Sequence, residues 1–151
     1  MKKIIISCAL LCCSSAAFAG SWAVGLGGQI IATVSNVNNS GAVGVGIVKA
    51  ENNLKVIITR RYFDDSDCQD GSKDTSTFLI DNQMVNVTNG TQCFYNQGIY
   101  DSVYYVESEK GINYIINQFK NKNSVRVNGY RVNAKGFTAT LKKLTGLKKA
   151  I

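Results

Sequence analysis

The chain has 151 residues, with 17 Lys and Arg, 10 Asp and Glu, five cysteines, no proline and no histidine. A chain of this length is sufficient for one domain with a hydrophobic core but not for two. The lack of histidine excludes the commonest general base, most nucleophile triads and the commonest metal ligand.

The N-terminal residues have the pattern of a secretory signal peptide. A start with two lysines is followed by an apolar run over residues 4–13 and by a small-x-small cleavage site at Ala17-Phe18-Ala19. The apolar run is too short to cross the ~30 Å hydrocarbon core of a membrane. We therefore expect residues 1–19 to be cleaved and residues 20–151 to form one β-rich domain. We expect the mature chain to have no transmembrane segment and to be periplasmic or secreted.

Two cysteines, Cys68 and Cys93, remain once the signal peptide is removed. Two cysteines in an exported chain favour one disulfide bond. The alternative is a metal site, but two thiolates without histidine make a poor zinc site. The sequence therefore predicts a Cys68–Cys93 disulfide, with no metal and no cofactor.

Alternating apolar residues and β-branched runs predict a series of strands from residue 21 to residue 108. Asn38-Asn39-Ser40-Gly41 is typical of a turn between two of these strands, and Asn89-Gly90 predicts a second hairpin, which returns Cys93 towards Cys68. The predicted strands are 21–24, 29–37, 42–50, 54–63, 75–80, 84–87, 91–97 and 101–108.

An acidic stretch over residues 64–74 carries five aspartates. It does not meet the spacing of an EF-hand loop, because Ser76 stands where a loop that starts at Asp65 needs glutamate. A looser calcium site built from Asp65, Asp67 and Asp70 is one interpretation. A solvated loop held by Cys68 is the other.

The last quarter of the chain predicts a helix, a hairpin and a second helix. Asn128-Gly129 is a strong two-residue turn and divides residues 124–132 into two short strands. Helical periodicity on either side of this hairpin is carried first by Ile112, Ile115, Ile116 and Phe119, and then by Phe137, Leu141, Leu144, Leu147 and Ile151. The predicted fold class is α+β, with a mostly antiparallel β-sheet body, one internal helix and a C-terminal amphipathic helix.

The same quarter is strongly basic, since residues 110–151 contain ten Lys and Arg and no Asp or Glu. This surface could bind an anionic envelope component, such as a lipid headgroup or lipopolysaccharide, or an acidic protein. It could also be a solvated face. Because the protein is exported, no nucleic-acid partner is expected. The candidate anion or partner surface comprises Arg126, Arg131, Lys135, Lys142, Lys143, Lys148 and Lys149.

Catalytic constellations are scarce. Outside the acidic stretch, the carboxylate pair is Glu107 and Glu109, which the predicted strand 101–108 and its end would place on one face. Paired carboxylates can hydrolyse glycosides, but no other feature of the sequence supports that activity. We therefore expect the protein not to be an enzyme.

The order of features resembles the invasion-associated locus B family of exported bacterial proteins. The similarity rests on Trp22, the Cys68 and Cys93 pair, the helix 112–119, the strand pair 124–132 and the segment that begins at Gly136-Phe137. The resemblance implies a non-enzymatic binding role in the envelope, linked in some members to host-cell invasion and virulence. The alternative function is a periplasmic inhibitor or immunity-type protein that blocks a lysozyme or a toxin.

Overall fold

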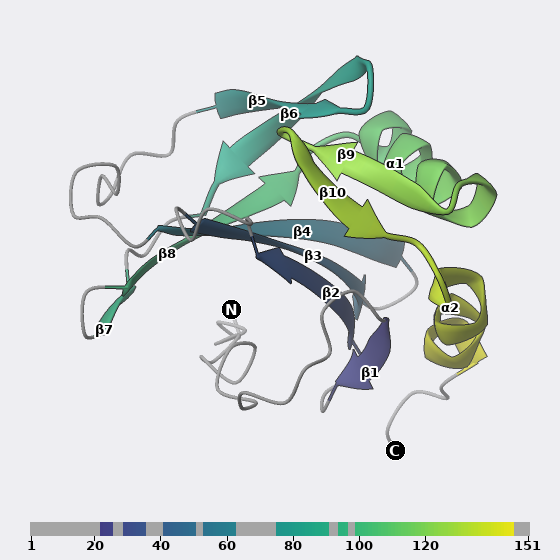
Figure 1. Cartoon of the computed structure of the whole chain (residues 1–151). Helices are drawn as coiled ribbons and strands as arrows, with labels where there is room; N and C mark the ends of the chain where they lie inside the picture. Colours follow the sequence, from purple (N-terminus) through teal and green to yellow (C-terminus); the bar gives the residue numbers. More distant parts are fainter. Residues whose placement is uncertain are drawn as a thin grey trace.

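The computed structural model describes residues 22–25, 29–35, 41–50, 53–62, 75–90, 94–96 and 99–146. Ten strands and two helices form within these residues (Figure 1). The strands are β1 (Ala23–Gly25), β2 (Gln29–Ser35), β3 (Gly41–Ala50), β4 (Asn53–Tyr62), β5 (Thr75–Ile80), β6 (Gln83–Asn89), β7 (Phe94–Asn96), β8 (Ile99–Val106), β9 (Ser124–Val127) and β10 (Tyr130–Asn133). The helices are α1 (Glu109–Asn121) and α2 (Phe137–Gly146).

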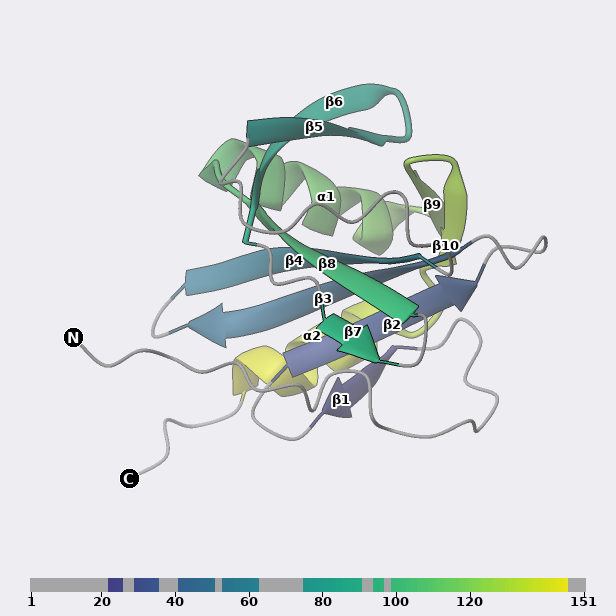
Figure 2. The same ribbon diagram turned by 90° about the vertical axis from the view of Figure 1, so that its left-hand side faces the viewer.

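The strands form one antiparallel sheet in the order β1-β2-β3-β4-β8-β6-β5-β9-β10, with β7 paired to β8. The sheet curls so strongly that β10, at one end of this order, comes to lie beside β2 near the other end (Figures 1 and 2). The sheet is therefore almost closed into a barrel. This confirms the α+β class and the antiparallel body, whereas the near-closure was not predicted.

Alternation along the strands decides which side chains enter the core. In β3, Val43, Val45 and Ile47 are almost fully buried, and Val45 lies opposite the buried Ile58 of β4. Burial of each such side chain contributes about 1.5–3 kcal/mol relative to exposure. The period of two thus fixes the register of the sheet, because a slip by one residue would turn these side chains away from the core.

Helix α1 begins at a side-chain cap and packs closely on the sheet. The Ser108 hydroxyl accepts a hydrogen bond from the Gly111 N–H at 3.0 Å, as an N-cap residue does. A Cβ at Gly111 would stand 3.0 Å from side-chain atoms of both Val85 and Val106, so this glycine lets the helix approach β6 and β8. The buried face of α1 comprises Gly111, Ile112, Ile115, Ile116 and Phe119.

Trp22, which directly precedes β1, contacts both helices and strand β10. Its ring lies 5.0 Å from that of Phe119 in α1 and 4.6 Å from that of Phe137 in α2, both in edge-on geometry. Its indole N–H donates to the backbone oxygen of Asn133 in β10 at 2.8 Å. Such aromatic pairs contribute about 0.5–1.5 kcal/mol each beyond their buried area. The early tryptophan is therefore central to packing.

One predicted hairpin is wrong. Asn89-Gly90 does not turn the chain back along β6, because β6 pairs with β5 and β8, while β7 pairs with β8. The Gly90 N–H instead donates to the Val103 oxygen of β8 at 2.8 Å, which extends the β6–β8 contact past the end of the strand. The local turn signal is overridden because β8, ten or more residues later, already occupies that edge of β6.

Several predictions fall outside the described residues. These are the signal peptide of residues 1–19, the acidic stretch 64–74, and Cys68 and Cys93 with their disulfide.

Candidate anion-binding site

Two arginines of the predicted surface lie directly opposite each other on the β9–β10 hairpin. Asn128 and Gly129 form its turn with φ of 47° and 87°, which suits this residue pair. The register places Arg126 against Arg131, and both side chains are exposed. Like charges directly opposite on a sheet are destabilising. Packing therefore does not explain this pair.

The valines of the hairpin explain why both arginines face outward. Val125, Val127 and Val132 are fully buried, so the alternating residues of each strand must point away from the core. The burial pattern of β9 accordingly places Val125 and Val127 on the inside and Arg126 on the outside.

Asp81 ties this hairpin to the end of α1 and to the β5–β6 turn. Its carboxylate accepts from the Lys122 ammonium at 2.9 Å and from the Arg126 backbone N–H at 2.9 Å. Its own backbone N–H donates to the Arg126 oxygen at 2.8 Å. Burial acts to raise the pKa of Asp81, but the hydrogen bond and charge of Lys122 and the N–H and charge of Arg126 outweigh it. The pKa therefore lies below the ordinary value of 3.8.

Most of the basic side chains between residues 110 and 146 make no ion pair within the described part of the chain. Among the residues that the structure describes, eight Lys and Arg side chains lie between 110 and 146, all exposed, and the ion pair within this set is that of Lys122 with Asp81. The remaining cations are solvated. An anionic ligand can reach them without first breaking an ion pair between described residues.

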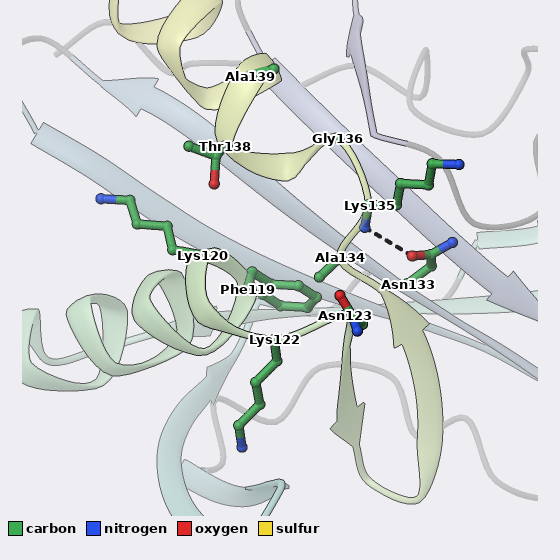
Figure 3. Close-up of a pocket in the computed structure, with 10 residues that line it drawn as sticks. All are labelled: Phe119, Lys120, Lys122, Asn123, Asn133, Ala134, Lys135, Gly136, Thr138 and Ala139. Carbon is green, nitrogen blue, oxygen red and sulfur yellow. Dashed lines mark hydrogen bonds between the residues drawn. The ribbon is translucent and has the colours of Figure 1, made fainter.

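A pocket of about 590 Å³ opens where α1 ends, β10 ends and α2 begins (Figure 3). Lys120 and Lys135 extend on opposite sides of it, while Lys122 turns away towards Asp81 (Figure 3). None of the described residues that line it is acidic. The lining residues are Phe119, Lys120, Lys122, Asn123, Asn133, Ala134, Lys135, Gly136, Thr138 and Ala139.

The walls of the pocket are held by short backbone contacts. The Ala134 N–H donates to the Asn123 oxygen at 2.9 Å, which fixes the connection after β10 against the residue before β9. The Asn133 side-chain oxygen accepts from the Lys135 N–H at 2.8 Å (Figure 3). Phe119, which lines the pocket, is only 1% exposed and packs 5.4 Å from Phe137. The pocket is therefore built on the core rather than on a separate loop.

The structure brings some of the predicted surface together and leaves other residues apart. Lys135 lines the pocket, and the Arg126–Arg131 pair lies on the hairpin whose last residue, Asn133, also lines it. Lys142 and Lys143 are exposed on α2, and Lys142 stands one helical turn beyond the lining residues Thr138 and Ala139. Lys148 and Lys149 lie outside the described residues.

Sequence reasoning missed the pocket itself. Lys120, Asn123 and Thr138 are not among the candidate residues that the sequence indicates. The signal is the convergence of three segments that carry basic and amide side chains: the end of α1, the end of β10 and the start of α2. That signal is visible only once the helix–hairpin–helix order is folded.

The predicted carboxylate pair is not formed. Glu107 lies beyond β8 and accepts a hydrogen bond from the Thr88 hydroxyl, while Glu109 is the first residue of α1. The strand ends at Val106 because the chain there turns into the Ser108 cap, so the two residues do not share a strand face. Within the described ranges, no group of three or more His, Cys, Asp or Glu side chains is arranged to hold a metal ion.

Comparisons with known proteins find no relative. No family model matches the chain, and neither the curated proteins nor the solved structures yield a significant match. Among the described residues, neither helix has the length and apolar character needed to span a membrane.

Proposed function

We propose that the protein is an exported envelope protein that acts by binding rather than by catalysis, and that its partner is an anionic envelope component. The partner is held on the basic surface formed by Arg126, Arg131, Lys135, Lys142 and Lys143, which Lys148 and Lys149 would extend. This is the kind of role that the resemblance to the invasion-associated locus B proteins implies.

The Arg126–Arg131 pair is the observation that carries this proposal. Two exposed cations directly opposite on a hairpin are unfavourable in the free protein. An anion that bridges them turns this repulsion into two charge-assisted contacts, for which guanidinium groups are well suited. The signal peptide expected at residues 1–19 supports a partner in the envelope rather than an intracellular nucleic acid.

The test is sedimentation of the exported protein with phosphatidylcholine vesicles, with and without phosphatidylglycerol. We expect binding to depend on the anionic lipid and to weaken with added salt, because the Debye length falls from ~10 Å at about 0.1 M salt to ~3 Å at about 1 M. Failure to sediment with anionic vesicles at low salt would overturn the proposal.

A charge-matched pair of variants locates the binding surface. Arg126→Gln with Arg131→Gln removes two charges from the hairpin, and we expect it to abolish most of the vesicle binding. Lys55→Gln with Lys110→Gln removes two exposed charges from β4 and from the start of α1, away from the hairpin. This control is expected to bind like the wild type. An equal loss in both variants would indicate attraction by net charge alone.

A further inference from the structure

We propose that the pocket between α1, the β9–β10 hairpin and α2 is a phosphate-binding subsite of this basic surface. The inference rests on the proposed function and names the chemical group of the partner that enters the pocket: a phosphate, borne by a lipid headgroup or free in solution. The pocket's volume of about 590 Å³ leaves room for a phosphate and part of the group that carries it.

The side chains around the pocket provide positive charge. The Lys120 and Lys135 ammonium groups make no ion pair with any described residue, and their side chains extend outward from two sides of the pocket (Figure 3). Lys122 provides a contrast within the same lining, because its charge is satisfied by Asp81 at 2.9 Å. A structural partner thus accounts for one lysine of the three and leaves the other two for a ligand.

The polar groups of the lining are mostly hydrogen-bond donors. Thr138 and Ala139 belong to the first turn of α2, where backbone N–H groups have no acceptor within the helix. The Thr138 hydroxyl points towards the Phe119 and Lys120 side of the pocket (Figure 3). Asn123 adds an amide group, and no acidic residue lies in the first turn of α2. A phosphate, with acceptor oxygens in several directions, matches donors that come from α1, α2 and the residue before β9.

The lining is also prearranged. The Asn123–Ala134 and Asn133–Lys135 contacts fix the chain on two sides, and the Trp22–Phe119–Phe137 rings fill the space beneath. Backbone donors that are held in place before a ligand arrives lower the entropy cost of binding. The backbone of the pocket is therefore expected to move little when phosphate binds.

The experiment is an NMR titration of the exported protein with inorganic phosphate, compared with sodium chloride at matched ionic strength. We expect saturable shifts of the Thr138 and Ala139 amide signals with phosphate only. Lys120→Gln with Lys135→Gln should weaken phosphate binding by about tenfold or more, as removal of charge-assisted contacts does. The Lys55→Gln with Lys110→Gln control should bind phosphate like the wild type. Both changed lysines of the pocket are exposed, so the spectrum of the folded state should persist in each variant.

Vesicles that carry phosphatidic acid identify the source of the phosphate and separate this inference from the proposed function. If the pocket variant loses affinity for these vesicles as well as for inorganic phosphate, the pocket takes a lipid phosphate. If it loses only inorganic phosphate, the subsite takes a free phosphate. If phosphate and chloride shift the same signals equally, or the pocket variant binds phosphate like the wild type, the inference is overturned. In that case the proposed function would still stand if Arg126→Gln with Arg131→Gln lost vesicle binding and the pocket variant did not.

Discussion

The two hairpins that meet at Asp81 have the same construction and different outer faces. Both β5–β6 and β9–β10 turn in two residues and bury alternating apolar side chains on the inside. They are joined by the Asn128 N–H, which donates to the Leu79 oxygen at 2.8 Å, and by the Leu79 N–H, which donates to the Asn128 side chain at 2.8 Å.

Their outer faces differ in charge. Leu79 lies opposite Met84 on the outside of β5–β6, whereas Arg126 lies opposite Arg131 on the outside of β9–β10. The inner faces are similar because the side chains of both hairpins pack in the same hydrophobic core. The outer faces are under no such constraint, and the like-charged pair on β9–β10 is the difference on which the proposed binding role rests.

The largest expected effect is on stability, and it distinguishes the buried face of β5 from its exposed face. Ile80 is fully buried, while its neighbour Leu79 is 42% exposed. Ile80→Ala should lower the free energy of unfolding by about 2–5 kcal/mol because it leaves a cavity. Leu79→Ala should change it by less than about 0.5 kcal/mol. Urea denaturation of both variants measures the difference, and similar losses would show that the outer face is packed in solution.

The contact between the two hairpins is tested at Asp81. Asp81→Ala removes the acceptor of the Arg126 N–H and the partner of Lys122, and it places alanine at a φ of 51°. We expect a loss of about 1.5–3 kcal/mol in the free energy of unfolding, the range for hydrogen bonds to a charged group. Asp81→Asn tolerates the positive φ and should lose less. An alanine variant as stable as the wild type would show that the backbone and Asn128 hydrogen bonds, with the buried side chains, suffice to hold the hairpins together.

The same residue gives a pH dependence. The folded-state pKa of Asp81 lies below 3.8, so its carboxylate contributes stability that is fully present above the unfolded-state pKa, at about pH 4 and higher. That contribution is lost as the pH falls through the lower, folded-state pKa. The stability gap between the wild type and Asp81→Asn should therefore be larger at about pH 6 than at about pH 2. A gap that is constant across this range would contradict the ion pair.

The smallest effect has the opposite sign. Arg131→Thr removes one member of the like-charged pair and introduces a residue that favours strands, so it should raise the free energy of unfolding by about 0.2–1 kcal/mol. The gain should shrink in high salt, which screens the repulsion. The same variant should bind anionic vesicles less well. A more stable protein with unchanged binding would remove the functional explanation of the arginine pair.

Local patterns were sufficient for much of this fold. The strand 75–80 was predicted with the bounds of β5, and the turn at Asn128-Gly129 lies where predicted. Helix α1 was predicted from its apolar face, which is the face that it buries. These elements are defined by period and turn chemistry within a few residues, and the core then uses the same faces.

Pairing between distant segments could not be read in this way. The turn signal at Asn89-Gly90 is strong locally, yet β6 takes β8 as its partner, and β10 approaches β2 from the opposite end of the order. The lining of the pocket falls within residues 119–139, but these residues surround one space only when α1, the β9–β10 hairpin and α2 are packed together. A sequence contains no local signal for the point at which three such segments meet.

The hydrogen bond from the Trp22 indole to Asn133 spans 111 residues of chain. The backbone oxygen of Trp22 also lies 3.4 Å from the Thr140 hydroxyl, and its ring packs on Phe137. Synthesis at about 5–20 residues per second separates the appearance of these partners by roughly 5–20 s. During this interval the first strand has none of its contacts with β10 and α2. The Trp22 end of the domain therefore gains its contacts with β10 and α2 only after residues 133–140 have been made.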